Sequence, residues 1–302
     1  MVSYWRKTIT SIVLHHYKLN QKMNVKYAII ICLLILPVIG WGQSEVTRRV
    51  GAAEMGYCGK VHTVQLTEFC MDSATRFFTT TAEAYNEQGL RTDMSSVADF
   101  LYQSNFHYEY DGNGRLVYYV ETYPEGGMDS IVFFYDKNGC LFGYKEYGIN
   151  ADPTEGNDVT DYLVTCDAQC RVLTCASVWE DTTWYEYDNQ GRLLKKTQSW
   201  KTDKAQTYDY TRHGRLERVR SGDKYYEDTH YKYDANGDTI EVWHTNWEHL
   251  EGENGPHHVG QHRHYAYTQY DDHGNWTKAT VTVQESGKTY TSTIIRTFGY
   301  YD

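Results

Sequence analysis

A tract of histidines near the carboxy-terminal end has the residue types and spacing to bind a metal ion. Within 21 residues the tract contains His244, His249, His257, His258, His262 and His264. On an extended strand His262 and His264 point to one face, because side chains alternate between the two faces. A third imidazole from His257 or His258 would complete a site for zinc, copper or nickel. The alternative is a long polar hairpin whose histidines face solvent.

Tryptophan side chains form a second group of candidate site residues. The chain has 8 tryptophans and 29 tyrosines, and exposed aromatic rings could stack on sugars. We expect Trp184, Trp243 and Trp247 to be the ligand-binding residues if the protein binds carbohydrate. Packing in the core is the alternative interpretation for most of these rings.

Motifs for catalysis are absent from the sequence. It contains no G-x-S-x-G, no H-E-x-x-H, no P-loop and no G-x-G-x-x-G after a strand. The segment DANGD, residues 234–238, spaces three oxygen ligands like a calcium loop, but its glycine is fourth instead of sixth and no glutamate follows at position twelve. We therefore expect neither an enzyme nor a cofactor.

A motif of the form Y-x-Y-D-x-x-G-R-L repeats through most of the chain. Its eight copies are AYNEQGL at 84–90, YEYDGNGRL at 108–116, FFYDKNGCL at 133–141, TCDAQCRV at 165–172, YEYDNQGRL at 185–193, YDYTRHGRL at 208–216, YKYDANGDTI at 231–240 and TQYDDHGNW at 268–276. Most copies lie 21 to 25 residues apart. That length fits one β-hairpin and a connection.

The residues D-x-x-G-R have the chemistry of a hairpin turn. Aspartate favours the first position of a type I turn, glycine supplies the left-handed residue, and arginine can pair with the aspartate. The predicted turn residues are Asp111, Gly114, Arg115, Asp136, Gly139, Asp188, Gly191, Arg192, Gly214, Arg215, Asp234, Gly237, Asp271 and Gly274. Cys170 replaces the glycine in one copy, so we expect a different loop there or a disulfide that holds it.

The repeats predict one apolar, aromatic face on each hairpin. The expected cross-strand pairs are Tyr110 with Leu116, Tyr108 with Tyr118 and Phe106 with Val120. One hairpin cannot bury this face alone, and about sixteen strands exceed the roughly 10 that an open sheet holds without curling. We therefore predict an all-β fold over residues 61–302, a repetitive antiparallel β-hairpin meander that curls into an open shell, spiral or sandwich.

The motif resembles the YD repeat of the RHS family, most clearly at residues 108–116, 185–193 and 208–216. The closing stretch, residues 270–302, is similar to the ending of short secreted YD-repeat proteins of Bacteroidetes. In large family members such repeats enclose a toxin or form an adhesive shell. Eight copies are too few for a closed cage, so the resemblance implies a non-enzymatic scaffold or interaction module, with carbohydrate binding as the alternative and metal binding as a third.

The amino-terminal residues predict export. Lys22 and Lys26 precede the apolar run YAIIICLLILPVI, and Gly40 and Gly42 precede a cleavage site before Gln43. We interpret residues 1–42 as a signal peptide, with 1–22 a possible upstream start artefact, and residues 43–60 as a linker. We expect no membrane span after cleavage, and a location in the periplasm, on the outer surface or outside the cell.

Removal of residues 1–42 takes away five basic residues and changes the formal net charge from −11 to −16. Such a charge repels nucleic acid and anionic membranes. We therefore expect a protein or a glycan at the cell envelope as the partner.

Six cysteines remain after Cys32 is removed, an even number in a chain bound for an oxidising compartment. We predict that Cys140 pairs with Cys166 or Cys170 to join neighbouring repeats, and that Cys58 and Cys70 pin the first strands. Cys175 would take the remaining partner or stay free. A zinc site at Cys166, Cys170 and Cys175 is the alternative.

Overall fold

The computed structural model describes most of the chain from residue 52 onward. The described residues are 52, 55–71, 76–98, 102–150, 156–178, 181–199, 205–222, 227–249, 256–285 and 287–301. The chain divides into two compact units, residues 1–37 and 38–302, and all described residues belong to the second. The predicted signal peptide, residues 1–42, lies outside them. No helix of the described residues is long and apolar enough to span a membrane.

Eighteen antiparallel strands make up the described part of the second unit. They are β1 (Val61–Met71), β2 (Arg76–Tyr85), β3 (Arg91–Ala98), β4 (Tyr102–Tyr110), β5 (Leu116–Thr122), β6 (Met128–Tyr135), β7 (Leu141–Ile149), β8 (Asp158–Cys166), β9 (Val172–Ser177), β10 (Thr182–Tyr187), β11 (Leu193–Gln198), β12 (Gln206–Tyr210), β13 (Leu216–Ser221), β14 (Glu227–Tyr233), β15 (Thr239–His249), β16 (Pro256–Tyr270), β17 (Trp276–Glu285) and β18 (Lys288–Tyr300). Each strand pairs with the next, and β1 also pairs with β18. The sheet therefore closes into an 18-stranded barrel.

This closure corrects one part of the predicted fold. The all-β antiparallel hairpin meander is confirmed, but the open shell, spiral or sandwich is wrong. The eight repeats supply β2 to β17, whereas β1 and β18 flank them and pair with each other. An unpaired edge would present a row of free N–H and C=O groups, and the pairing of β1 with β18 removes both edges at once.

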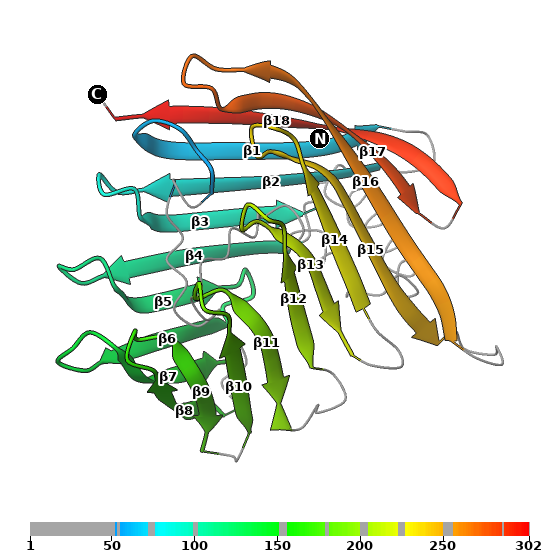
Figure 1. Ribbon diagram of the computed structural model, residues 1–302. Helices are drawn as coiled ribbons and strands as arrows, with labels where there is room; N and C mark the ends of the chain where they lie inside the picture. The colour runs from blue at the N-terminus through cyan, green and yellow to red at the C-terminus, as the bar shows by residue number, and fades with distance from the viewer. Residues whose placement is uncertain are drawn as a thin grey trace, which may run out of the picture. The chain divides into compact units, whose positions relative to one another are not determined.

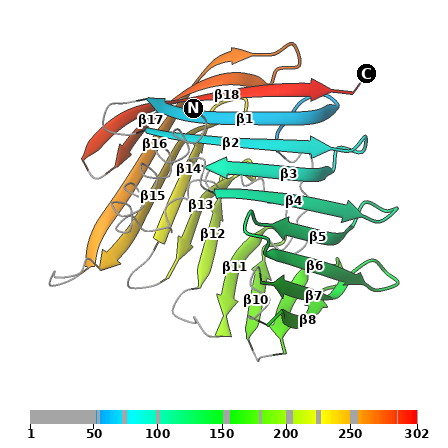
Figure 2. The same ribbon diagram turned by 180° about the vertical axis from the view of Figure 1, so that it is seen from behind.

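The strands are arranged as two walls that cross each other. Figure 1 shows β2 to β8 running across the view and β11 to β16 crossing in front of them at a steep angle. Figure 2 shows the same arrangement from behind. Because consecutive strands alternate in direction, the eight motif turns all lie at one rim of the barrel.

Part of the predicted linker packs against this barrel. The amide of Ala52 donates to the carbonyl of Gly89 over 2.7 Å. The side chains of Met55 and Tyr57 are buried, and the Tyr57 ring lies edge-on to Tyr85 and Phe298. These residues just before β1 therefore belong to the folded unit.

Every copy of the motif forms the same type of turn. At Asp111, the backbone amide donates to the carbonyl of Arg115, and the amide of Gly114 donates to the carbonyl of Asp111, both over 2.9 Å. The Asp111 carboxylate accepts the amides of Asn113 and Arg115, and Arg115 Nε donates to its Oδ2 over 2.6 Å. The turn glycines have φ from +72° to +99°, a conformation that glycine adopts without steric cost.

A β-bulge beside each turn changes the predicted register. Tyr110 pairs with Leu116 as expected, but Tyr108 lies opposite Tyr119 and not Tyr118, and Phe106 lies opposite Glu121 and not Val120. The second strand of each hairpin carries one extra residue, which increases the local twist. The first two inward side chains of that strand are therefore three residues apart in sequence instead of two. The buried Leu141 and Tyr144 are an example.

Neighbouring repeats are joined by a contact that we call the rung. In five copies the hydroxyl of the motif tyrosine donates to a backbone carbonyl at the start of the preceding strand, over 2.7 to 2.9 Å. These donor and acceptor pairs are Tyr110 with Arg91, Tyr135 with Leu116, Tyr187 with Val172, Tyr210 with Leu193 and Tyr233 with Leu216. Burial raises the pKa of Tyr210 to about 12, so its hydroxyl keeps the proton that it donates.

Arginine side chains complete the rungs. The guanidinium of the arginine in one turn lies over the tyrosine ring of the next repeat, at 4.7 to 5.5 Å from the ring centroid. These pairs are Arg115 with Tyr135, Arg171 with Tyr187, Arg192 with Tyr210 and Arg215 with Tyr233. The motif arginine therefore stabilises its own turn and also packs on its neighbour.

One rung is covalent. Cys140 occupies the arginine position of its copy, and Cys170 occupies the glycine position of the next, where its φ is +60°. The two form a disulfide with a Cα to Cα distance of 4.8 Å, which confirms one of the two predicted pairings. Cys166 stands where the motif has tyrosine, and its thiol donates to the carbonyl of Leu141 over 3.2 Å.

The other predicted disulfide is wrong. Cys58 is exposed and Cys70 is buried, and neither is bonded to another cysteine. Cys70 points inward on β1, where its thiol donates to the carbonyl of Thr291 on β18 over 3.3 Å. Cys166 and Cys175 also carry free thiols.

Replacement of Tyr210 by phenylalanine tests the rung. Tyr210→Phe removes the hydroxyl that donates to Leu193, and we expect the free energy of unfolding to fall by about 1 kcal/mol in a urea titration. Tyr270→Phe is the matched control, since Tyr270 holds the same motif position but is 47% exposed, while Tyr267 donates to the Thr239 carbonyl. Equal losses in the two variants would contradict this role of the hydroxyl.

Substitutions at the disulfide test whether it replaces a rung. Cys140→Ser opens a bridge between residues 30 apart, and we expect the free energy of unfolding to fall by about 3 to 4 kcal/mol. The triple variant Cys140→Arg, Cys166→Tyr and Cys170→Gly restores the motif, so it should regain part of that loss. A triple variant less stable than Cys140→Ser would show that the two kinds of rung are not equivalent.

Candidate binding surfaces

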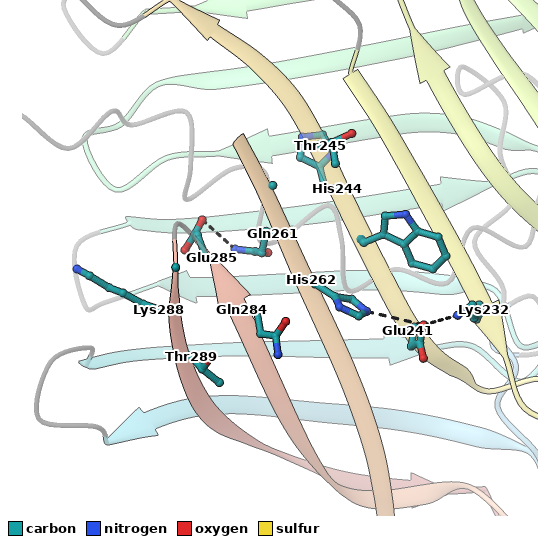
Figure 3. A pocket seen from close by; sticks show the side chains of 13 residues that line it. Lys232, Glu241, His244, Thr245, Gln261, His262, Gln284, Glu285, Lys288 and Thr289 are labelled. Atoms are coloured by element: carbon teal, nitrogen blue, oxygen red, sulfur yellow. Dashed lines mark hydrogen bonds and ion pairs between the residues drawn. The ribbon is translucent and has the colours of Figure 1, made fainter. Parts of the chain in front are cut away.

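A row of outward-facing side chains crosses five strands at the histidine tract. The strand register aligns His230 of β14, Trp243 of β15, His262 of β16, Gln284 of β17 and Thr289 of β18. The last four of these residues line an open groove on the outer side of the barrel, which Figure 3 shows. We call this surface the histidine groove.

Glu241 organises the charges of the histidine groove. Lys232 Nζ donates to its carboxylate over 2.7 Å, and His262 Nε2 and His264 Nδ1 lie 3.7 and 3.9 Å from its oxygens. The hydrogen bond from Lys232 lowers the pKa of Glu241. Figure 3 shows the Glu241 side chain between His262 and Lys232. The carboxylate is therefore already engaged by the ammonium group of Lys232.

Imidazoles from both neighbouring strands contact the Trp243 ring. His230 stacks on it at 4.8 Å with an angle of 6° between the planes, and the planes of His262 and Trp243 are steeply inclined with their centroids 6.0 Å apart. A sugar that stacked on the face covered by His230 would have to displace that ring. The predicted role of Trp243 as a sugar platform therefore has little support from this geometry.

The predicted metal ligands are brought together only in part. His262 and His264 lie on one face of β16, on either side of Glu241. His257 and His258 continue β16 and pair with Glu248 and Trp247. The side chains of His257, His258 and Trp247 lie outside the described part of the chain. Among the side chains that are described, no three of histidine, cysteine, aspartate or glutamate form a group that could hold a metal ion.

The aspartate-rich segment 234–238, whose oxygen ligands are spaced like those of a calcium loop, is an ordinary motif turn. Asp234 Oδ1 accepts the backbone amides of Gly237 and Asp238 over 2.8 and 2.9 Å. Burial raises the pKa of Asp238, which disfavours a charged ligand at that position. Asp234 Oδ1, which a calcium ion would need as a ligand, is therefore already hydrogen-bonded to the backbone of the turn.

Asp228 anchors the strands beside the histidine groove. Its carboxylate is only 4% exposed and accepts two hydrogen bonds from Arg218, Nε over 2.8 Å and the terminal nitrogen over 2.5 Å. Arg220 and His230 lie 3.7 and 3.3 Å away. Burial alone would raise the pKa of Asp228, but the hydrogen bonds from Arg218 and the nearby positive charges lower it overall.

A second surface, which sequence reasoning missed, covers the outer side of β6 to β11. Among the described residues eleven large hydrophobic side chains are exposed, and nine of them lie on or beside these strands. We call the nine the apolar band: Phe134, Phe142, Ile149, Val159, Leu163, Leu173, Val178, Trp184 and Leu194, with exposed fractions of 37% to 68%. Monomeric proteins rarely expose so many neighbouring apolar groups without a binding role.

Side chains of the apolar band are next to buried residues in sequence, as expected for a strand whose two faces alternate. Examples are Phe134, Phe142 and Leu163, and Trp184 precedes the buried Tyr185. Trp184 is the only predicted ligand-binding tryptophan within the band, at 42% exposed. Elsewhere the outward positions are polar, as on β18, where threonines at 289, 291, 293 and 297 alternate with inward residues. The apolar band is therefore a local feature of one wall.

A sequence signal for the apolar band exists beside the turns. Three turns are followed by a buried, inward residue, which is Leu141, Val172 or Leu193. In each case the next residue lies at the bulge and is also large and apolar. In the other hairpins this next position carries Thr92, Val117, Glu217, Ile240 or Thr277, and the apolar Val117 and Ile240 are only partly exposed. An apolar residue at the bulge therefore does not by itself predict the band.

Comparisons with known proteins do not assign this chain to a family. No protein-family model matches the chain, and no curated protein matches it. A porin-like protein from Bacteroides uniformis is 14% identical over 79% of this chain and 96% of its own length, with a TM-score of 0.41. The Tc holotoxin pore of Photorhabdus luminescens is 13% identical over 75% of this chain and 18% of that chain, with a TM-score of 0.22. Similarity this low carries no functional argument.

The lowered pKa of Asp228 predicts a pH-dependent loss of stability. The pKa of an aspartate in the unfolded chain is about 3.9. Because the folded protein lowers the pKa of Asp228, ionised Asp228 stabilises the fold fully above that pH, and this stabilisation is lost as pH falls through the lower pKa of the folded state. We expect Asp228→Asn to be less stable than the native protein at pH 7 in urea titrations, and the gap to narrow below about pH 4. Asp272→Asn, at an exposed turn position, is the control. A gap that stays constant with pH would contradict the assignment.

Proposed function

We propose that this protein is an exported, non-enzymatic YD-repeat protein that acts as a scaffold or interaction module at the cell envelope or outside the cell. The apolar band on β6 to β11 carries the proposal. Its exposed side chains are concentrated on one wall, while ion pairs such as Lys145 with Asp161 and Lys195 with Glu186 lie among them. Clustered aromatic and other apolar side chains are typical of the core of a protein interface, whose rim is polar.

Export has support from two independent features. Residues 1–42 have the order of a signal peptide, and Cys140 and Cys170 form a disulfide in the folded unit. Disulfides persist in oxidising compartments and are rare in the cytosol. The eight motif turns support the resemblance to the YD-repeat family, whose short members are secreted.

The non-enzymatic part of the proposal rests on what the charged residues do. The carboxylates of Asp111, Asp167 and Asp188 accept hydrogen bonds from their own turns and from Arg115, Arg171 and Arg192. Groups held in this way act as structural partners and are poorly placed for general acid or base chemistry.

Carbohydrate binding is the second candidate, and Trp184 favours it. Its indole ring is 42% exposed, and its cross-strand neighbours are the small residues Thr174 and Thr197. A ring with such neighbours can stack on a sugar more readily than Trp243, on which His230 is stacked. Binding of a polysaccharide that is lost in Trp184→Ala would favour this function over the protein interface.

Site-specific photocrosslinking in the producing bacterium tests the proposed function. A benzophenone amino acid in place of Leu163 should give a covalent adduct with another protein, because Leu163 is the most exposed member of the apolar band, at 68%. The same group in place of Ile295, a 42% exposed residue on β18, is the matched control and should give none. Adducts of equal yield at both positions, or none at Leu163, would contradict the proposal.

A further inference from the structure

The seam where the barrel closes contains residues that match the repeat motif. Residues 300–301 at the end of β18 and residues 58–61 at the start of β1 are far apart in sequence, but β18 lies beside β1 (Figure 1). We propose that these two segments form a ninth, divided copy of the motif, and that this copy is a latch at which the barrel opens and closes. The latch lies outside the apolar band, so the proposed function does not depend on it.

The strand register across the seam is that of a motif hairpin. Tyr300 lies opposite Val61, and the next pair is Gly299 with Thr63, so a β-bulge separates the two pairs. A bulge has the same place beside the motif turns, where a tyrosine lies opposite the first residue of the second strand. β18 and β1 are therefore paired like the two strands of a motif hairpin whose turn is divided.

Contacts of the turn are also reproduced. The amide of Tyr301 donates to the carbonyl of Lys60 over 2.9 Å, which is the bond that joins the aspartate and arginine positions in other copies. Gly59 stands at the glycine position and has a φ of +85°, within the range of the motif glycines. The motif positions Y-D and G-R-L are therefore held by Tyr300, Tyr301, Gly59, Lys60 and Val61.

The preceding repeat supplies the oxygen that the divided copy lacks. In most copies the side chain at the aspartate position accepts the amide of the residue before the glycine, as Asp111 does from Asn113. In the divided copy this amide belongs to Cys58 and donates to Asn275 Oδ1 over 2.6 Å. Asn275 holds the arginine position of the eighth copy, and its Nδ2 donates to the Tyr300 hydroxyl over 2.8 Å. It therefore contacts the tyrosine of the next copy, as the motif arginines do.

The seam differs from the other strand pairs in one physical respect. Among the described strands, every other pair of neighbours is consecutive in the chain, so a connecting segment keeps the two strands close when their contacts break. β1 and β18 have no direct connection, and only non-covalent contacts bring them together again. The entropy of closing the long intervening chain favours separation here. Local opening is therefore expected at the seam before it occurs elsewhere.

Buried polar groups at the seam also favour opening. Glu68 of β1 accepts hydrogen bonds at Oε1 from Ser292 of β18 over 2.6 Å and from Arg263 of β16 over 2.5 Å. The buried Oε2 of Glu68 and Nε of Arg263 have no hydrogen-bond partner. Leaving such groups unpaired costs free energy, which water recovers when the seam opens. The cluster therefore holds the latch through Oε1 and lowers the cost of its opening through Oε2.

Hydrogen exchange of the mature protein, residues 43–302, measured by NMR, tests the latch. Successive amides of β1 point alternately to β18 and to β2. We expect those that donate across the seam to exchange at least about 10-fold faster than those that donate to β2, because the latch opens without global unfolding. Equal exchange rates on the two sides of β1 would overturn the inference.

A disulfide across the seam should remove this difference. A Cβ atom at Gly299 would lie 3.8 Å from that of Thr63, its register partner, which suits a disulfide. Thr63→Cys with Gly299→Cys, made with Cys58→Ser to remove a competing thiol, should slow the exchange of cross-seam amides at least about 10-fold. Thr67→Cys with Thr80→Cys, on the connected strands β1 and β2, is the matched control and should leave these amides unchanged. Unchanged cross-seam exchange in the locked protein would contradict the latch.

Substitution of one glycine tests whether the motif residues form the latch. Gly59→Ala places a side chain at a φ of +85° and 3.0 Å from Nδ1 of His273, so cross-seam amides should exchange about 10-fold faster. Gly287→Ala is the matched control, since Gly287 has a φ of +75° in the turn from β17 to β18 and no neighbouring atom within 4 Å. It should leave the cross-seam amides unchanged. Equal effects of the two substitutions, or none of Gly59→Ala, would show that the divided copy is not the latch.

Discussion

The contact between one repeat and the next determines the whole structure. A single hairpin exposes its aromatic face, so it gains stability only when a neighbour covers it. The rung makes that contact specific, because the tyrosine hydroxyl must reach a carbonyl of the preceding strand and the arginine must lie on the following tyrosine. The same residues therefore specify the turn within a repeat and the spacing between repeats.

The hairpins and their turns could be predicted from the sequence because their signals are local. Asp111, Gly114 and Arg115 are close in sequence and act on one another, and all eight copies fold as hairpins. The motif also limited the expected partner of Cys140 to Cys166 or Cys170, and the structure shows that Cys170 is the partner. Local chemistry was sufficient for the turns and narrowed the choice for the disulfide.

Closure, register and the apolar band could not be predicted, for different physical reasons. Closure depends on a pairing between residues 61–69 and 293–300, which no local pattern encodes. The bulge shifts one residue on each second strand, and an alternating pattern assumes no such shift. As a result, the predicted cross-strand partners Tyr118 and Val120 were each wrong by one residue. The histidine tract was visible in the sequence, but the Lys232 that engages Glu241 comes from another strand.

The covalent rung lies at the rim of the strands that present Phe134, Phe142, Leu163 and Leu173. In a reducing compartment Cys170 would hold its left-handed conformation with no bond to offset the steric cost. The bond therefore has two effects at this rim. It offsets the cost of that conformation, and it keeps the starts of β7 and β9 together when the weaker contacts between neighbouring repeats break.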